Sequence, residues 1–197
     1  EDIDVLTAGE LAGLTATNIK GLSEGINGQV AGLTGAQIKT LATSAVAALT
    51  STQVSSIHVD AVESLDLVAL TTETIKGLTA AQFNKLTFTQ IGSLDVADIA
   101  VLTSTQLAGL SGAGVDGLTN AHMAALTGTQ LGAISISGGG TSALASLDTS
   151  QLAALTTNNI GGLTTGQLAQ MTSTQIAGLG NDISVLSASQ IGAISAS

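Results

Sequence analysis

The sequence predicts an all-α solenoid built from very short capped helices. An eight-residue unit, or octad, recurs along most of the chain, and Leu102, Leu110, Leu118 and Leu126 mark four consecutive starts. A second apolar residue stands five positions after each start, and Gln directly precedes it in most octads. Short internal periods of this kind are typical of repeat architectures, in which neighbouring units bury a shared core.

The start of each octad predicts the start of a helix. With Thr as the N-cap residue, Gln falls at the third helical position, the spacing of a capping box. The Leu before Thr and the apolar residue after Gln are spaced as a hydrophobic staple. We therefore expect structural caps at Thr103, Gln106, Thr127, Gln130, Thr164, Gln167, Thr172 and Gln175.

The end of each octad predicts the end of the same helix. Its last two positions are usually Ala or Gly, as at Gly109 and Gly178. We expect Gly there to adopt a left-handed conformation before the next Leu, and the small residues to let successive coils approach closely. Helices of five or six residues do not form alone, so stacking between units must stabilise them.

A β-solenoid is the alternative, because Thr, Ser, Ile and Val are abundant. In a strand, however, the two apolar positions are an odd number of residues apart and face opposite sides. Every unit would then need an internal turn, and no Pro or Asn-Gly occurs at a fixed octad position. The pattern favours helices.

We interpret residues 1–197 as one continuous array. The octad spacing breaks at intervals, and these breaks predict irregular corners rather than domain linkers. They lie near residues 22–33, 57–70, 94–102, 134–147 and 179–186.

The composition excludes several classes of function. Four basic side chains against 14 acidic ones give a net charge of −10, so no phosphate-neutralising surface can form and nucleic-acid binding is not expected. The chain has no Cys and hence no disulfide, and no apolar stretch is long enough to insert into a membrane. A start at Glu1 without a signal peptide suggests a processed product, a fragment or another export route.

Candidates for catalysis are few, and we expect no enzyme. His122 occupies the Gln position of its octad, which predicts a substituted cap. His58 has Asp60, Glu63 and Asp66 nearby in sequence, but one His with scattered carboxylates is not a convergent metal or acid–base site. No Gly-x-Ser-x-Gly motif and no phosphate-binding loop occurs.

Calcium is the one cofactor with candidate residues. Asp2, Asp4, Asp98 and Asp182 sit at or near the recurring text DIDVL, DIAVL and DISVL. Neither an EF-hand loop nor a glycine-rich calcium nonapeptide is present. The alternative, that these carboxylates are solvated caps at corners, is favoured.

The strings LTSTQLAGL, LTGTQLGAI and LTTGQLAQMTSTQIAGL resemble Leu-Thr-x-x-Gln-Ile/Val arrays of very large bacterial exoproteins. Such proteins are labelled adhesion or haem-utilisation proteins, and many are exported by type I secretion. The resemblance covers most of the chain and implies an extracellular or cell-surface location. Two isolated His without Tyr or Cys provide no axial-ligand pocket for haem.

These observations lead to a hypothesis of an extracellular structural module, such as a filament, surface-layer or stalk segment that self-associates head to tail. The alternative is an adhesin that binds a glycan or a surface through residues 57–70 or 134–147. Phe83 occupies a core position, whereas Phe88 stands at the variable third position and is the aromatic residue we expect to be exposed. An ice-binding face is disfavoured, because Thr recurs once per octad as a cap rather than as a paired lattice.

Overall fold

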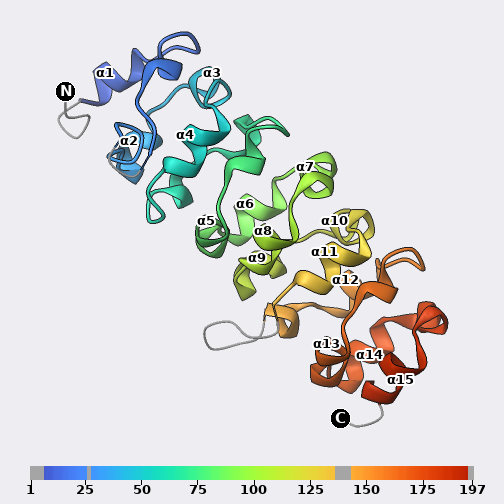
Figure 1. Cartoon of the computed structure of the whole chain (residues 1–197). Coiled ribbons are helices and arrows are strands. Elements are labelled where there is room, and N and C mark those ends of the chain that lie inside the picture. Colours follow the sequence, from blue (N-terminus) through green and yellow to red (C-terminus); the bar gives the residue numbers. More distant parts are fainter. Residues whose placement is uncertain (1–6, 26–27, 136–142, 195–197) are drawn as a thin grey trace.

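The computed structural model describes residues 7–25, 28–135 and 143–194. Over these ranges the chain forms short helices joined by tight turns, and no strand occurs in them. Figure 1 shows the helices arranged as one elongated stack with the two ends of the chain far apart. The all-α solenoid is thereby confirmed, and the β alternative does not hold for the described chain.

Most octads contain one turn or slightly more of α-helix, and some contain only a 3-10 turn. The α-helices are α1 (Ala8–Ala12), α2 (Gly35–Ile38), α3 (Thr43–Val46), α4 (Ser51–Ser56), α5 (Ala80–Lys85), α6 (Phe88–Gly92), α7 (Val96–Val101), α8 (Ser104–Ala108), α9 (Gly112–Asp116), α10 (Asn120–Ala125), α11 (Gly128–Ala133), α12 (Thr149–Ala153), α13 (Thr165–Gln170), α14 (Ser173–Gly178) and α15 (Ala188–Ile194). The 3-10 helices are η2 (Ile19–Gly21), η3 (Val62–Ser64), η4 (Leu67–Ala69), η5 (Ile75–Gly77), η6 (Ala143–Ser146), η7 (Ile160–Gly162) and η8 (Gly180–Val185).

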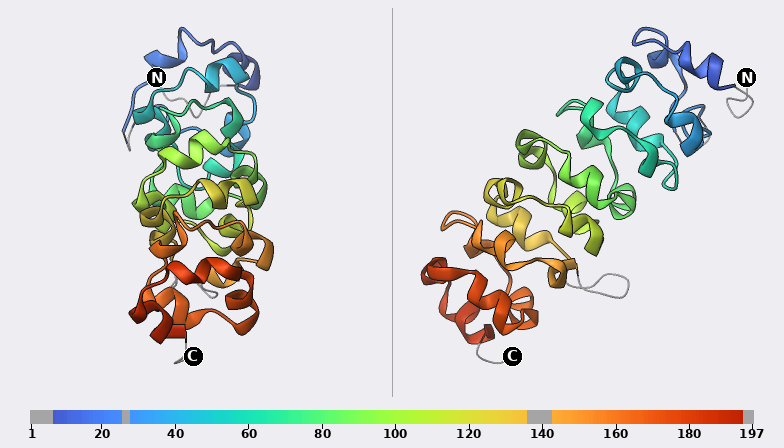
Figure 2. Two further views of the ribbon diagram at one scale, coloured as in Figure 1. Left: turned by 90° about the vertical axis from the view of Figure 1, so that its right-hand side faces the viewer. Right: turned by 180° about the vertical axis from the view of Figure 1, so that it is seen from behind.

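Three octads complete one coil of the solenoid. Helix α8 packs against α5, whose first residue lies 24 positions earlier, and α11 packs against α8 with the same offset. The pairs α6 with α9 and α7 with α10 repeat the relationship on the other two sides. Figure 2 shows the coils stacked one on the next along the long axis. Each side of the stack is thus a column of helices.

The array absorbs irregular spacing without losing this stacking. Between α10 and α12 the offset grows from 24 to 29 residues, from the N-cap Thr119 to the N-cap Asp148, yet the two helices still pack together. The five extra residues belong to the segment 134–147, of which 136–142 lie outside the described residues. Residues 94–102, where a corner is expected, carry the ordinary helix α7.

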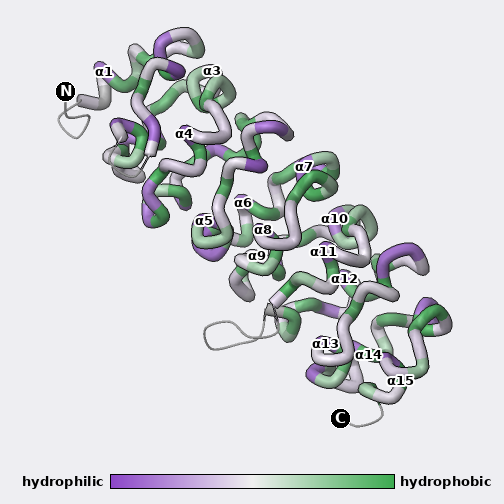
Figure 3. The backbone as a smooth tube through the Cα atoms, in the orientation of Figure 1, coloured by the Kyte–Doolittle hydropathy of each residue, from purple (hydrophilic) through white to green (hydrophobic). Residues whose placement is uncertain are grey.

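The core runs along the axis of the stack and consists almost entirely of aliphatic side chains. Both staple positions of the octad point into it: Leu102 and Leu107, for example, are 4% and 0% exposed. Phe83 is fully buried in the same position as Leu107. Figure 3 shows apolar segments recurring in every coil, with hydrophilic segments at several outer bends. Burial of two aliphatic residues per octad is the driving force for coil stacking.

The expectation for glycine at the octad end is half right. Among the described residues only Gly25 and Gly180 have positive φ, at 89° and 60°. Gly109 ends α8 at φ −78°, in the right-handed region, so a left-handed helix end is not the reason for Gly there. A Cβ on Gly109 would instead collide with the backbone of Ala80 in the preceding coil. Close approach of coils is what requires glycine at this position.

Candidate functional site

The capping box predicted from the octad is present in the structure. At the start of α8 the backbone N–H of Gln106 donates to Oγ1 of Thr103 at 3.2 Å, and the backbone N–H of Thr103 donates to Oε1 of Gln106 at 2.9 Å. The two bonds satisfy backbone donors that the first helical turn leaves unpaired. The same reciprocal pair of bonds is present at Thr127 with Gln130, Thr164 with Gln167, and Thr172 with Gln175.

The amide nitrogen of the same glutamine has a second role that the octad alone does not reveal. Nε2 of Gln106 donates to the carbonyl oxygens of Ile75 and Leu78, at 3.3 and 2.8 Å, where the chain turns between two octads of the preceding coil. Leu78 directly follows the short helix η5, and the carbonyl of Ile75, its first residue, also accepts the Leu78 N–H at 3.1 Å. Gln106 is only 4% exposed. Its amide oxygen and its amide nitrogen therefore make their hydrogen bonds inside the protein, shielded from water.

This contact recurs along the stack, and we call the set the glutamine ladder. In each case the residue at the fifth octad position donates to two backbone carbonyls about one coil earlier. Its members are Gln53 to Ile19 and Leu22, Gln82 to Val54 and Ile57, Gln90 to Val62 and Leu65, Gln106 to Ile75 and Leu78, Gln130 to Ile99 and Leu102, Gln151 to Val115 and Leu118, Asn159 to Met123 and Leu126, Gln167 to Leu131 and Ile134, Gln175 to Leu144 and Leu147, and Gln190 to Gly161 and Leu163.

A signal for the ladder was present in the sequence. A capping box accepts Glu as well as Gln at the third helical position. This chain places Gln there in most octads and Glu only at Glu10. A carboxylate can accept the capping bond but cannot donate to carbonyls, so the preference for an amide indicates that the NH₂ group is used.

His122 is a cap, as expected, and occupies the ladder position of its octad with a bond to one carbonyl rather than two. The backbone N–H of Thr119 donates to Nδ1 of His122 at 3.2 Å, and Nε2 lies 2.9 Å from the carbonyl oxygen of Leu94. Because a backbone N–H can only donate, Nδ1 is the acceptor and Nε2 carries the proton that bonds to Leu94. Both ring nitrogens are therefore engaged in structural bonds, and the side chain is 3% exposed.

His58 lies on the surface in a small charged cluster. Its Nδ1 is 3.7 Å from Oδ2 of Asp60, and Nζ of Lys85 is 3.2 Å from Oδ1 of the same carboxylate. All three side chains are largely exposed, so their mutual attraction is weak. The structure does not bring Glu63 or Asp66 into an ion pair with this cluster.

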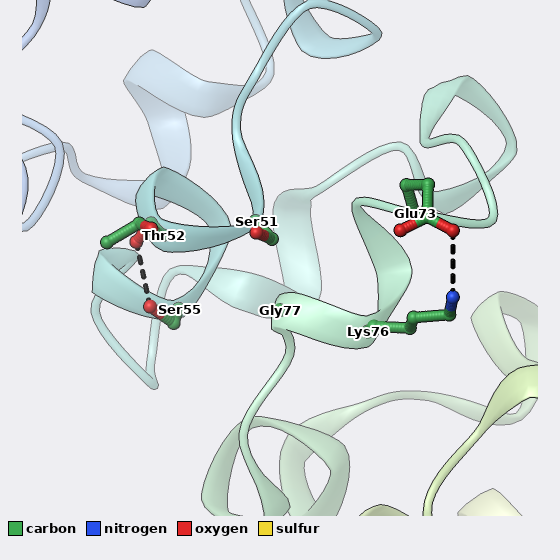
Figure 4. A pocket seen from close by; sticks show the side chains of 6 residues that line it. All are labelled: Ser51, Thr52, Ser55, Glu73, Lys76 and Gly77. Carbon is green, nitrogen blue, oxygen red and sulfur yellow. Dashed lines mark hydrogen bonds and ion pairs between the residues drawn. The ribbon is translucent and has the colours of Figure 1, made fainter.

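A shallow hollow lies between α4 and η5 (Figure 4). Ser51, Thr52, Ser55, Glu73, Lys76 and Gly77 line it. Nζ of Lys76 is paired with Oε1 of Glu73 at 2.8 Å, and Oγ of Ser55 donates to the carbonyl of Thr52 at 2.7 Å. Its polar groups thus bond to one another rather than converging on a common point, and no nucleophile is held beside a base.

The carboxylates proposed for calcium do not assemble in the described part of the chain. Asp98 is at the fifth octad position of α7 and Asp182 is in η8, at separate levels of the stack, while Asp2 and Asp4 lie outside the described residues. Over residues 7–25, 28–135 and 143–194 no three His, Asp or Glu side chains gather as metal ligands would. The arrangement of these carboxylates therefore does not support a calcium site in the described part of the chain.

The pKa values of two carboxylates at helix starts, Asp98 and Asp148, are shifted in opposite directions. Burial raises the pKa of Asp98, against a lowering by the hydrogen bond from the Asp95 N–H and together with repulsion from the Asp95 carboxylate. The pKa of Asp148 is lowered, because its carboxylate accepts bonds from the Gln151 N–H and the Ser150 hydroxyl. Asp148 acts as an ordinary N-cap, whereas Asp98 is a buried acid in a position where most octads have an amide.

Phe88 is exposed, in contrast to Phe83. Its side chain is 58% exposed at the third octad position of α6, and Val68 in η4 is 69% exposed. Isolated apolar side chains at a surface are common and do not by themselves define a binding site.

Comparison with known families agrees with the repeat. The model of the ALTTAQ repeat matches residues 59–96, 91–128 and 144–181, together more than half of the chain. The chain belongs to the ALTTAQ-repeat family. Searches of curated proteins and of solved structures find no match. In the ALTTAQ-repeat array seen here, no described helix is both long and apolar enough to cross a membrane.

Proposed function

We propose that the chain is an extracellular structural module, a segment of a filament, surface layer or stalk that holds other parts at a distance. The glutamine ladder carries this proposal. It joins each coil to the one before by the same bonds. The array can therefore be lengthened by adding coils that make the same contacts as the existing ones. The recurring polar and apolar side chains of the octad are used for bonds and packing inside the stack. The property that the array can offer to the rest of a protein is therefore its length and stiffness.

An extracellular location is supported by the acidic, lysine-poor and cysteine-free composition, and by the resemblance to bacterial exoproteins. Acidity also keeps an apolar-rich rod apart from its neighbours through like-charge repulsion. We propose no catalytic role, cofactor or nucleic-acid partner.

Coil insertion tests the spacer function. A second copy of residues 102–125, one full coil, is inserted after residue 125, and the length of the monomer is measured by small-angle X-ray scattering. Lengthening by one coil with retained helical circular dichroism is the expected result. A shuffled 24-residue insert of the same composition is the control and should extend as a loop without adding helix. A coil insertion that behaves like the shuffled insert would refute the proposal.

Head-to-tail association is a second part of this proposal. Earlier in the stack the second apolar position is buried, as at Leu152 and Leu168. In the last described coil, by contrast, Ile176 and Ile183 are half-buried and Ile191 is exposed. The hollow beside Ile176, lined by Met171, Thr172, Ser173 and Ile194, lies where a further helix would stack on α14. Leu14 and Leu22 in the first described coil are half-buried as well.

Sedimentation of the whole chain at increasing concentration tests this association. Ile176→Asp should abolish it, whereas Phe88→Asp, which places the same charge on the side of the stack, should preserve it. Melting curves for both variants verify folding. A wild-type chain that stays monomeric at millimolar concentration would exclude head-to-tail assembly and leave the spacer proposal intact.

An adhesin remains the second candidate because Val68 and Phe88 are exposed on the side of the stack. Glycan-array binding by the wild type that is lost in Phe88→Ser and retained in Phe83→Leu would favour it. No binding to glycans or to solid surfaces would leave the structural module as the better account.

A further inference from the structure

The fifth octad position of α7 breaks the rule of the glutamine ladder. Gln90 before it and Gln106 after it donate to the carbonyl pairs of Val62 with Leu65 and of Ile75 with Leu78. Asp98 stands between these two glutamines, and the carbonyl pair between their acceptors is that of Leu67 and Leu70. The offsets of 31 and 28 residues from Asp98 to this pair are those that Gln106 and Gln130 use.

A carboxylate at this point has the wrong hydrogen-bonding character. Asp98 accepts from the Asp95 N–H at 3.2 Å, as a glutamine would, but an ionised carboxylate has no proton for a carbonyl. The side chain is only 8% exposed, so water cannot fully replace the missing donor. Side-chain length is not the obstacle, since the equally short Asn159 donates to Met123 and Leu126 at 2.9 and 3.0 Å.

We propose that Asp98 is a proton-dependent joint between two coils, in which the protonated carboxyl donates to the carbonyl of Leu70 or Leu67 and the ionised form cannot. The Leu67 carbonyl already accepts the Leu70 N–H at 3.1 Å, so the missing donor matters most for the Leu70 carbonyl. The joint lies where the octad spacing shortens to five residues, from Leu65 to Leu70. Acid would tighten this level of the stack, and neutral pH would loosen it. This inference concerns one contact within the rod and does not depend on the proposed function.

The direction follows from linkage between protonation and folding. A carboxyl whose pKa is higher in the folded chain than in the unfolded chain binds more protons when folded, so folding is favoured as the pH falls through the interval between the two pKa values. The raised pKa of Asp98 therefore predicts stabilisation by acid. Asp95 is the charged group on its own helix turn, and α10, which packs against α7, carries His122, whose Nε2 contacts the Leu94 carbonyl.

The test is the melting temperature of wild type and Asp98→Asn between pH 7 and pH 4. Asparagine keeps the acceptor for Asp95 N–H and supplies a permanent donor. We expect Asp98→Asn to melt several degrees higher at pH 7 and the gap to close as the pH falls. Repeating the pair in a His122→Gln background removes the imidazole from the comparison. A gap that does not change with pH, or a variant less stable than wild type at pH 7, would overturn the proposal.

The reverse exchange and one spectroscopic measurement complete the test. Asn159→Asp should acquire the acid-dependent stability that wild-type Asp98 shows, and a pH-independent loss there would count against the mechanism. In the wild type, the ¹³C resonance of the Leu70 or Leu67 carbonyl should shift with the same midpoint as the Asp98 carboxyl. Carbonyl resonances that do not shift during the titration of Asp98 would refute the hydrogen bond, even if the melting temperatures of the variants behaved as expected.

Discussion

The amide nitrogen of Gln82 donates to the carbonyl oxygen of Ile57 at 2.8 Å, across 25 residues of sequence and one coil of the solenoid. The same side chain accepts the backbone N–H of Thr79 at 2.8 Å through Oε1. One amide thus closes the start of its own helix and a turn of the coil before it. The two functions can be separated experimentally, because one uses the oxygen and the other the nitrogen.

Gln82→Glu should be strongly destabilising although it preserves the shape and the capping oxygen. It buries a carboxylate against the carbonyls of Val54 and Ile57 and removes their donor, which costs roughly 3 kcal/mol. Urea denaturation followed by circular dichroism measures the loss. Gln170→Glu, at an exposed position outside the ladder, is the control and should change stability little. Equal effects at the two positions would argue against the ladder.

Thr103→Val removes the capping acceptor while keeping the shape of the side chain. The Gln106 N–H loses its bond to Oγ1, and we expect a loss of about 1 kcal/mol. Thr105→Val, two residues later on the exposed side of α8, makes the same chemical change without touching the cap. Denaturation midpoints that fall alike in both variants would show that the cap is not the cause.

Adjacent glycines in η7 provide a matched pair for the close approach of coils. A Cβ on Gly162 would collide with the backbone of Gly128 in the preceding coil, whereas a Cβ on Gly161 would meet no atom within 4 Å. Gly162→Ala should therefore destabilise by about 1–3 kcal/mol through overpacking, and Gly161→Ala should be nearly neutral. Thermal melts of the two variants decide the matter, and a larger loss at Gly161 would contradict the packing described here.

His122→Gln should preserve or raise stability, because glutamine supplies the same acceptor to Thr119 and two amide protons where the ring supplies one to Leu94. His122→Ala should lose roughly 2 kcal/mol, since both partners become unpaired. The comparison is made by chemical denaturation at pH 8. A glutamine variant as weak as the alanine variant would mean that this position does not belong to the ladder.

Asp148 should give a pH dependence opposite to that of Asp98. Its pKa is lowered by the bonds from the Gln151 N–H and the Ser150 hydroxyl, so its contribution is present above the pKa of the unfolded chain and is lost as the pH falls through the folded value. Asp148→Thr keeps a cap that does not titrate. The stability of wild type relative to this variant should fall on acidification below about pH 4. A difference that stays constant would exclude the carboxylate as the source.

The sequence by itself determined the local structure of this protein. A Thr and a Gln three residues apart meet through bonds within one helical turn, so their spacing predicts the capping boxes at Thr103 and Thr127 without knowledge of the rest of the fold. Apolar periodicity likewise placed Phe83 in the core and left Phe88 outside it.

Only the tertiary structure decided what links positions a whole coil apart. The number of octads per coil depends on the angle through which each turn redirects the chain. The capping and staple pattern within one octad does not fix the sum of these angles. Because three octads close a coil, Gln106 donates to the Leu78 carbonyl and Gly109 lies against the backbone of Ala80. For the same reason Asp98 lies where most octads use an amide to bond to the preceding coil. The octad therefore specified the helices, while the stacking of coils specified why its fifth residue is glutamine and its last is so often glycine.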